Sequence, residues 1–167
     1  SISFMEAIVM PMTWDDWPEI ARNIFQLMRS EAGEEIVLEK NIFVERILFN
    51  DSEKGLSDEA KKEYIRPFKN AGEDRRPTLT WPRQIPIDGS PEAVIDEVTK
   101  NGEFHKNSDI PKLFINADPG TILIGKQREF VRSWTNLKEV TVKGNHFVQE
   151  DSPHEIGEAI KVFIETI

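Results

Sequence analysis

The C-terminal part of the sequence alternates strand-like and helix-like segments, and this alternation constrains the fold more than any other feature. Residues 111–116 form a short apolar run that closes in an Ala-Asp-Pro-Gly turn, and residues 125–134 have the spacing of a helix. Residues 139–142 are again strand-like, and a helix is predicted to begin at Ser152. Strand, helix, strand and helix in succession indicate parallel βαβ winding. We therefore predict an α/β fold.

A further strand is predicted at the start of the chain, ahead of a long helical region. Residues 2–9 are apolar except at Ser3 and Glu6, which is typical of a strand covered on both faces in a mostly parallel sheet. Helix start signals and apolar residues at helical spacing then follow, and Asn101-Gly102 is predicted to end the last helix early. The predicted helical segments are residues 18–30, two short helices within 34–48, residues 57–65 capped by Ser57, and residues 93–98 after a break at 73–77 and a cap at Ser90. This insertion of roughly a hundred residues is expected to lie on the sheet as a lid.

His146 lies on the loop between the last predicted strand and the last predicted helix. Gly144 permits the tight turn that ends the strand, and Ser152 with Glu155 forms a capping box that has Pro153 at the first helical position. In open α/β sheets, catalytic side chains collect on loops that follow strand ends. A lone loop histidine is more often a surface or half-buried residue, so a catalytic role requires a partner.

Two carboxylates are candidates for that partner, and spacing alone does not distinguish them. Glu6 lies in or at the end of an apolar strand, where an ionised carboxylate must be paired or hydrogen-bonded. An equally good reading is that the strand register differs by a residue or two and Glu6 faces solvent. Asp118 follows a strand end directly, although an aspartate before Pro-Gly is more often a plain turn residue.

Composition and motifs exclude several classes of function. The net charge of -9 argues against nucleic acid or an anionic membrane as a partner. The chain has no cysteine, and its three histidines lack the spacing of metal ligands, with His105 and His154 in polar surroundings, so no metal is predicted. Without an apolar run of ~20 residues or a signal peptide pattern, the expected location is cytoplasmic.

No nucleophile motif is found in the sequence. Neither Gly-x-Ser-x-Gly nor Gly-x-Asp-x-Gly occurs. Residues 120–126 nearly match a phosphate-binding loop, but Gln127 has no hydroxyl for a magnesium ion, so the match is treated as coincidence. Several aromatic residues in the helical region are either core or an apolar lid over His146, which would suit a hydrophobic substrate.

Five stretches, taken in order, resemble the haloalkane dehalogenases of the α/β-hydrolase fold. The resemblance spans nearly the whole chain and is closest to the subgroup that includes hexachlorocyclohexane-degrading dehalogenases, with coelenterazine-type luciferase more distant. The stretches are Phe4-Met-Glu-Ala-Ile8, Asn41-Ile-Phe-Val-Glu45, Arg75 to Pro86, Lys112 to Gly120 and His146 to Pro153. One departure is residues 50–55, which are polar where the family carries mostly apolar residues.

The resemblance implies a division of the chain and roles for its residues. Residues 1–10 would be a strand of the main sheet, residues 11–107 the helical cap, and residues 108–167 the C-terminal part of the main domain. Glu6 would be the triad acid and His146 the general base. The positions that match the family's substrate pocket are Phe25, Phe43, Trp81, Pro82, Ile85, Ile122 and Phe147.

The implied reaction is hydrolysis of a carbon–halogen bond in a small hydrophobic substrate, with water consumed, halide released and no cofactor. An aspartate would attack the carbon to form an ester, which water would hydrolyse after His146 removes its proton. The aspartate and the tryptophan and asparagine halide donors belong to an N-terminal half that this chain lacks, so the chain alone is expected to be inactive. The alternatives are a non-catalytic remnant or interaction module, and another α/β hydrolase such as an esterase or epoxide hydrolase.

Overall fold

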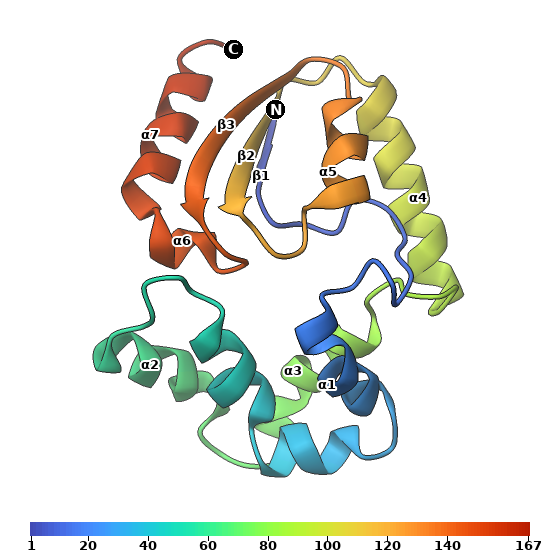
Figure 1. The fold of residues 1–167 in the computed structure, drawn as a ribbon, viewed down its shortest axis with the longest axis vertical. Coiled ribbons are helices and arrows are strands. Elements are labelled where there is room, and N and C mark those ends of the chain that lie inside the picture. The colour runs from blue at the N-terminus through green and yellow to red at the C-terminus, as the bar shows by residue number, and fades with distance from the viewer.

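The computed structural model describes residues 1–167, which form two lobes (Figure 1). We call residues 1–10 and 92–167 the sheet lobe, and residues 11–91 the helical lobe. The elements follow in chain order as β1 (Ile2–Phe4), α1 (Glu19–Arg29), the π-helices η1 (Glu34–Glu39) and η2 (Phe43–Ile47), the 3₁₀-helix η3 (Leu48–Asn50), α2 (Asp58–Ile65), the 3₁₀-helices η4 (Arg66–Phe68) and η5 (Glu73–Arg75), α3 (Arg76–Arg83), α4 (Glu92–Asn107), β2 (Lys112–Pro119), α5 (Gly125–Arg132), β3 (Leu137–Gly144), α6 (Val148–Asp151) and α7 (Pro153–Ile164).

The sheet consists of three parallel strands in the order β1-β2-β3. β2 is the central strand, and its side chains alternate between two buried faces. Leu113 and Ile115 pack against Ile156 and Phe163 of α7, whereas Phe114 packs on the opposite face against α5. Helices therefore cover both faces, as Figure 1 shows, and the predicted α/β fold with parallel βαβ winding is confirmed.

The first strand is shorter than its apolar sequence predicts. β1 pairs with β2 only over Ile2–Phe4, so the prediction of a strand up to Val9, covered on both faces, is wrong. Phe4 stacks on Phe114 with ring centroids 5.5 Å apart, and the chain then turns at Glu6, whose φ is 41°. This turn takes Glu6 out of the sheet and toward the helical lobe.

α4 is longer than predicted and belongs to the sheet lobe, where it lies next to α5 (Figure 1). It runs through Gly102, where a Cβ atom would meet the Val9 carbonyl oxygen at 2.8 Å and the Phe130 ring at 2.9 Å. The glycine therefore permits close packing and does not end the helix. His105 on the same helix stacks on Trp134 at 5.3 Å, so its predicted polar surroundings were also wrong.

The helical lobe has the helices that the sequence indicates, together with the 3₁₀-helices η3, η4 and η5 and the α-helix α3. Ser57 caps α2 by accepting a 3.1 Å hydrogen bond from the amide of Ala60, as predicted, and two short helices occupy residues 34–47, both with π geometry. The break predicted at residues 73–77 is instead η5 followed directly by α3, which has Pro77 in its first turn. None of the helices is both long enough and apolar enough to cross a lipid bilayer.

Two neighbouring chain segments connect the lobes. Met12 donates from its amide to the Pro86 carbonyl at 3.0 Å, and Asp88 donates to the Met12 carbonyl at 3.0 Å. The buried amide side chain of Gln127 accepts from Val9 at 3.0 Å, which fixes the outgoing segment to α5. The predicted cap boundaries, residues 11–107, stay a prediction, and the packing of α4 favours a cap that ends before Glu92.

Candidate active site

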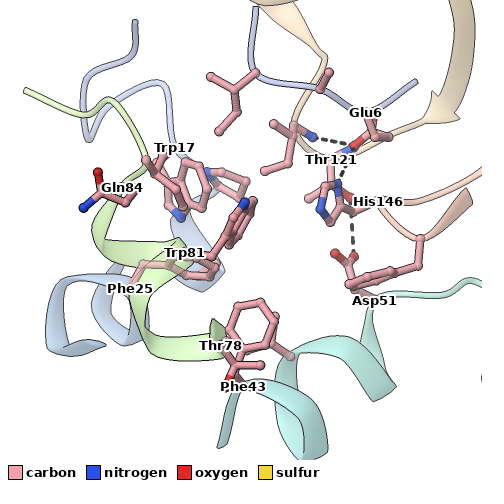
Figure 2. Close-up of a pocket in the computed structure, with 18 of the residues that line it drawn as sticks. Glu6, Trp17, Phe25, Phe43, Asp51, Thr78, Trp81, Gln84, Thr121 and His146 are labelled. Carbon is pink, nitrogen blue, oxygen red and sulfur yellow. Dashed lines mark hydrogen bonds and ion pairs between the residues drawn. The ribbon is translucent and has the colours of Figure 1, made fainter. Parts of the chain in front are cut away.

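Glu6 is buried at the boundary between the lobes, where backbone amides hold its carboxylate (Figure 2). Its Oε2 accepts hydrogen bonds from the amides of Thr121 at 3.0 Å and Ile122 at 2.8 Å. The same oxygen lies 3.4 Å from Nδ1 of His146, and Glu6 is only 6% exposed. Amide donors offset the cost of burying a carboxylate, so Glu6 has a fixed position next to the imidazole.

His146 follows β3 on the loop that leads to α6. Its ring packs edge-on against Phe147 with centroids 5.0 Å apart, and its side chain is 24% exposed. Because Nδ1 faces Glu6, Nε2 is the ring nitrogen left for substrate or water. The structure thus brings together the histidine and one of its two candidate acids. The other, Asp118, is exposed at the end of β2 and does not line the cavity described below.

The helix after His146 does not begin with the predicted capping box. α6 intervenes between the strand and α7, and the Ser152 side chain makes no cap hydrogen bond. Its Oγ donates instead to the Lys143 carbonyl at 2.6 Å, back toward β3. Pro153 does occupy the first position of α7, as predicted.

A cavity of about 660 Å³ lies between the lobes and contains both members of the pair. Of its 20 lining residues, 11 are hydrophobic, and Figure 2 shows aromatic side chains of the helical lobe facing His146. Six of the predicted pocket residues line it, namely Phe25, Phe43, Trp81, Ile85, Ile122 and Phe147. The seventh, Pro82, does not line this cavity; it is buried in α3, where its carbonyl accepts from Arg29 at 2.9 Å.

Asp51 lines the same cavity and was not predicted as a site residue. Burial raises the pKa of its carboxyl group, and the negative charge of Glu6 adds to this. A positive charge on His146, the Thr121 hydroxyl and the main-chain amide of His146 lower it. The polar stretch at residues 50–55 was the sequence signal for it. Whether Asp51 lines the cavity, however, depends on the tertiary fold, which a local sequence pattern does not specify.

A second acidic residue, Asp151, joins the lobes close to His146. Its buried carboxylate accepts from the Ser52 hydroxyl at 2.8 Å and from the amides of Glu53 and Lys54, both at 3.0 Å. It also accepts from the Asn145 amide at 3.2 Å. Burial alone would raise the pKa of Asp151, but these hydrogen bonds together hold the pKa below its usual value. We call these contacts the Asp151 clasp.

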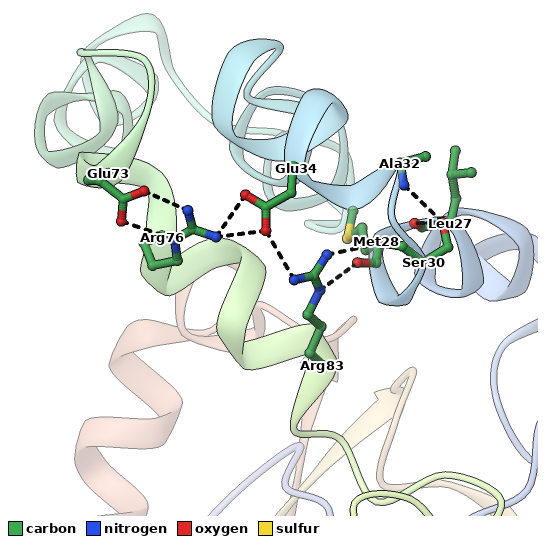
Figure 3. Close-up of polar contacts among 8 residues, drawn as sticks. All are labelled: Leu27, Met28, Ser30, Ala32, Glu34, Glu73, Arg76 and Arg83. Carbon is green, nitrogen blue, oxygen red and sulfur yellow. Dashed lines mark hydrogen bonds and ion pairs between the residues drawn. The ribbon is translucent and has the colours of Figure 1, made fainter.

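Exposed ion pairs fix α3, the helix that carries Trp81 to the cavity (Figure 3). Arg76 donates to both oxygens of Glu34 at 2.8 Å and also pairs with Glu73. Arg83 reaches Glu34 at 3.2 Å and donates to the carbonyl of Met28 at 3.1 Å. We call Glu34, Glu73, Arg76 and Arg83 the Glu34 cluster. It ties α3 to η1 and to the end of α1.

A buried carboxylate paired with a histidine that follows a parallel strand, under a helical lobe, is the arrangement of the α/β-hydrolase fold. Solved structures of that fold superpose closely on the chain. The haloalkane dehalogenase DbeA from Bradyrhizobium elkani has a TM-score of 0.92 at 32% identity, over 98% of this chain and 58% of that one. DbjA has a TM-score of 0.92 at 35% identity, over 98% of this chain and 58% of that one.

Curated relatives specify the resemblance further, whereas no family model matches the chain. A haloalkane dehalogenase from Sphingobium indicum is 52% identical over 163 residues, 98% of this chain and 55% of its own length. One from Mycolicibacterium smegmatis is 52% identical over 168 residues, 99% of this chain and 54% of its own length. The coelenterazine h 2-monooxygenase of Renilla reniformis is 43% identical over 157 residues, 93% of this chain and 50% of its own length.

The chain spans about half the length of the curated relatives that it matches. In sequence and in fold, it corresponds to the C-terminal portion of the haloalkane dehalogenases.

Proposed function

We propose that this chain provides the acid, the base and most of the substrate cavity of a haloalkane dehalogenase. The reaction is hydrolysis of a carbon–halogen bond in a halogenated aliphatic compound to an alcohol and a halide ion. The observation that carries the proposal is the Glu6–His146 pair, which opens into a largely apolar cavity. The 52% identity to dehalogenases over nearly the whole chain supports it.

In the proposed mechanism, an aspartate carboxylate from a segment outside residues 1–167 attacks the carbon that bears the halogen. The new carbon–oxygen bond displaces the halide with its electron pair and leaves an aspartyl ester. His146 then takes one proton of a water molecule at Nε2 while the water oxygen bonds to the ester carbonyl carbon. The bond from that carbon to the substrate oxygen breaks, this oxygen takes the other proton of the water to give the alcohol, and the carboxylate is regenerated. The imidazolium finally loses its proton to solvent. Glu6 orients the ring through Nδ1 and stabilises the imidazolium.

Each part of the cavity suits this reaction. Apolar side chains such as Phe25 and Ile122 accommodate an aliphatic chain and exclude bulk water from the ester. The amides of Thr121 and Ile122 keep Glu6 in place while the charge on His146 changes. The halide donors, like the nucleophile, are proposed to come from outside this chain, and a cytoplasmic location stays a prediction.

Halide release from 1-bromobutane tests the proposal. We would compare the 167-residue chain alone with the same chain joined, as one polypeptide, to the part of the Sphingobium indicum dehalogenase that it does not match. We expect no turnover from the chain alone and steady bromide release from the joined protein. His146→Ala should abolish steady release beyond about one bromide per protein molecule, because His146 is the general base that activates water for hydrolysis of the ester.

The matched control is His154→Ala, which changes an exposed histidine on α7. Turnover by the chain alone would show that the nucleophile lies within it. A folded joined protein that releases no bromide would overturn the dehalogenase assignment, and cleavage of p-nitrophenyl butyrate by that protein would instead indicate an esterase.

A further inference from the structure

Asp51 places a second carboxylate in the cavity, and this carboxylate has few partners in the protein. Glu6 and Asp51 are the acidic residues among the 20 that line the cavity, and no lysine or arginine lines it. Glu6 accepts two amide hydrogen bonds and faces His146. The Asp51 side chain accepts a long hydrogen bond, 3.4 Å from Thr121 Oγ1, and a lesser one from the main-chain amide of His146. An ionised carboxylate has about four acceptor sites, so Asp51 retains capacity for a donor.

The Asp151 clasp holds this carboxylate in position. The three residues after Asp51 donate to Asp151 through the hydroxyl of Ser52 and the amides of Glu53 and Lys54. The main-chain carbonyl of Asp51 also accepts from the Phe147 amide at 3.4 Å. Figure 2 shows Asp51 on the helical lobe, on the opposite side of His146 from Glu6. The segment is thus fixed at both its main chain and its neighbouring side chains.

The surroundings of Asp51 favour a donor from a ligand. A carboxylate in a largely apolar cavity loses hydration that two weak hydrogen bonds do not fully replace. Burial and the charge of Glu6 raise the pKa of Asp51, which is consistent with an incompletely satisfied acid. His146 carries a positive charge only during part of the proposed reaction. A donor group on the bound substrate would satisfy the carboxylate throughout.

We propose that Asp51 is a specificity-determining residue and that the cavity prefers halogenated alcohols, whose hydroxyl group donates to the Asp51 carboxylate. The inference rests on the proposed function and names its substrate class. A site built to hydrogen-bond a substrate hydroxyl discriminates strongly against analogues that lack it, because the polar group of the protein is then left unpaired.

Equilibrium binding to the 167-residue chain tests this proposal without turnover. Three probes have the same number of heavy atoms: 4-bromo-1-butanol has a donor, 1-bromo-3-methoxypropane has only an ether oxygen, and 1-bromopentane has neither. Trp17 and Trp81 line the cavity, so quenching of tryptophan fluorescence at pH 8 gives the dissociation constants. We expect the alcohol to bind about tenfold more tightly than the ether.

Asp51→Leu should remove this preference, and Asp51→Asn, which keeps one acceptor oxygen and a similar size, should reduce it. Asp96→Asn, at an exposed aspartate of α4, is the matched control and should leave it unchanged. Circular dichroism establishes that each variant is folded, and if Asp51→Leu does not fold, the Asn variant decides. Equal binding of alcohol and ether by the unchanged chain, no binding of any probe, or a preference that survives in the folded Asp51 variants would overturn the proposal.

This result is independent of the dehalogenase test. Absence of bromide release from 1-bromobutane by the joined protein would overturn the proposed function while the binding preference is still measured. Loss of the binding preference would leave bromide release from 1-bromobutane as it is.

Discussion

Two glutamates in this chain illustrate two ways of holding a carboxylate. Glu6 accepts from the backbone amides of Thr121 and Ile122 and is 6% exposed. Glu34 accepts from two arginine side chains, and its own side chain is 49% exposed. Backbone donors have fixed positions and act where water is scarce, whereas exposed ion pairs are screened and lose side-chain entropy. The first arrangement positions a reacting group, and the second only joins helices.

Among the variants considered, Glu6→Gln should have the largest effect, which is on the rate of bromide release. The amide has about the same size but no charge to stabilise the imidazolium of His146, and it can favour the wrong tautomer. We expect bromide release by the joined protein to fall by about 10³–10⁴-fold.

Glu34→Gln in the same protein is the control and should leave bromide release within about twofold, because this residue lies outside the cavity. If the two variants lost activity equally, the contrast between the two glutamates would be wrong.

Asp151→Ala tests whether a buried carboxylate with backbone donors also contributes more to stability than an exposed ion pair does. The change leaves the amides of Glu53, Lys54 and Asn145 without an acceptor. We expect the free energy of unfolding, measured in urea, to fall by about 2–4 kcal/mol. Glu155→Ala, at an exposed position of α7, is the control, and an equal loss there would contradict the interpretation.

The same residue gives a pH dependence with a defined sign. The pKa of Asp151 is lowered in the folded protein, so its stabilisation is fully present above the unfolded value of about 3.9 and is lost as pH falls through the folded value. The difference in unfolding free energy between the unchanged chain and Asp151→Ala should therefore shrink below about pH 4. A difference that stayed constant from pH 7 to pH 3 would exclude this charge effect.

Gly102→Ala extends the comparison of buried and exposed positions to side-chain packing in the sheet lobe. The new methyl group would meet the Val9 carbonyl and the Phe130 ring, so we expect a net loss of about 1–3 kcal/mol in thermal or urea unfolding.

Gly157→Ala is the matched control, since a Cβ at this glycine of α7 meets nothing within 4 Å. Because alanine favours helix more than glycine, this variant should be more stable by up to ~1 kcal/mol. If both variants changed the free energy of unfolding in the same direction, the space at Gly102 would not be too small for a methyl group.

Glu34→Gln should have the smallest effect on stability. The cluster is exposed, and we expect the midpoint of thermal unfolding to fall by no more than ~2 °C, with the difference removed at 1 M salt. Glu31→Gln, an exposed neighbour, is the control. A large decrease in the unfolding midpoint that persists in high salt would show that the Glu34 cluster stabilises the fold as strongly as the buried carboxylates do.

The sequence was most informative where local pattern and fold agree. The apolar run of β2 and the proline at the start of α7 predicted their elements, because strand burial and helix initiation depend on neighbouring residues. Local signals failed where distant residues decide: Gly102 packs against Val9, and the Ser152 hydroxyl binds the Lys143 carbonyl.

The same reasoning separates the parts of the candidate site. Residue spacing left Glu6 and Asp118 open, and the resemblance to a family selected Glu6, which the structure places 3.4 Å from His146. Asp51 was not predicted, since its position depends on how residues 52–54 meet Asp151 across the lobe boundary. No short-range pattern encodes that contact.

The paired segments at Met12 and Ile87 have a mechanical consequence. On that side the two chain segments that cross between the lobes are held to each other by a main-chain ladder, with Met12 bonded to Pro86 and Asp88. Near His146 the Asp151 carboxylate accepts three hydrogen bonds across the lobe boundary. A motion that separates the lobes would hinge at the ladder and break the hydrogen bonds to Asp151. The amide protons of Glu53 and Lys54 should therefore exchange with solvent before those of Met12 and Asp88.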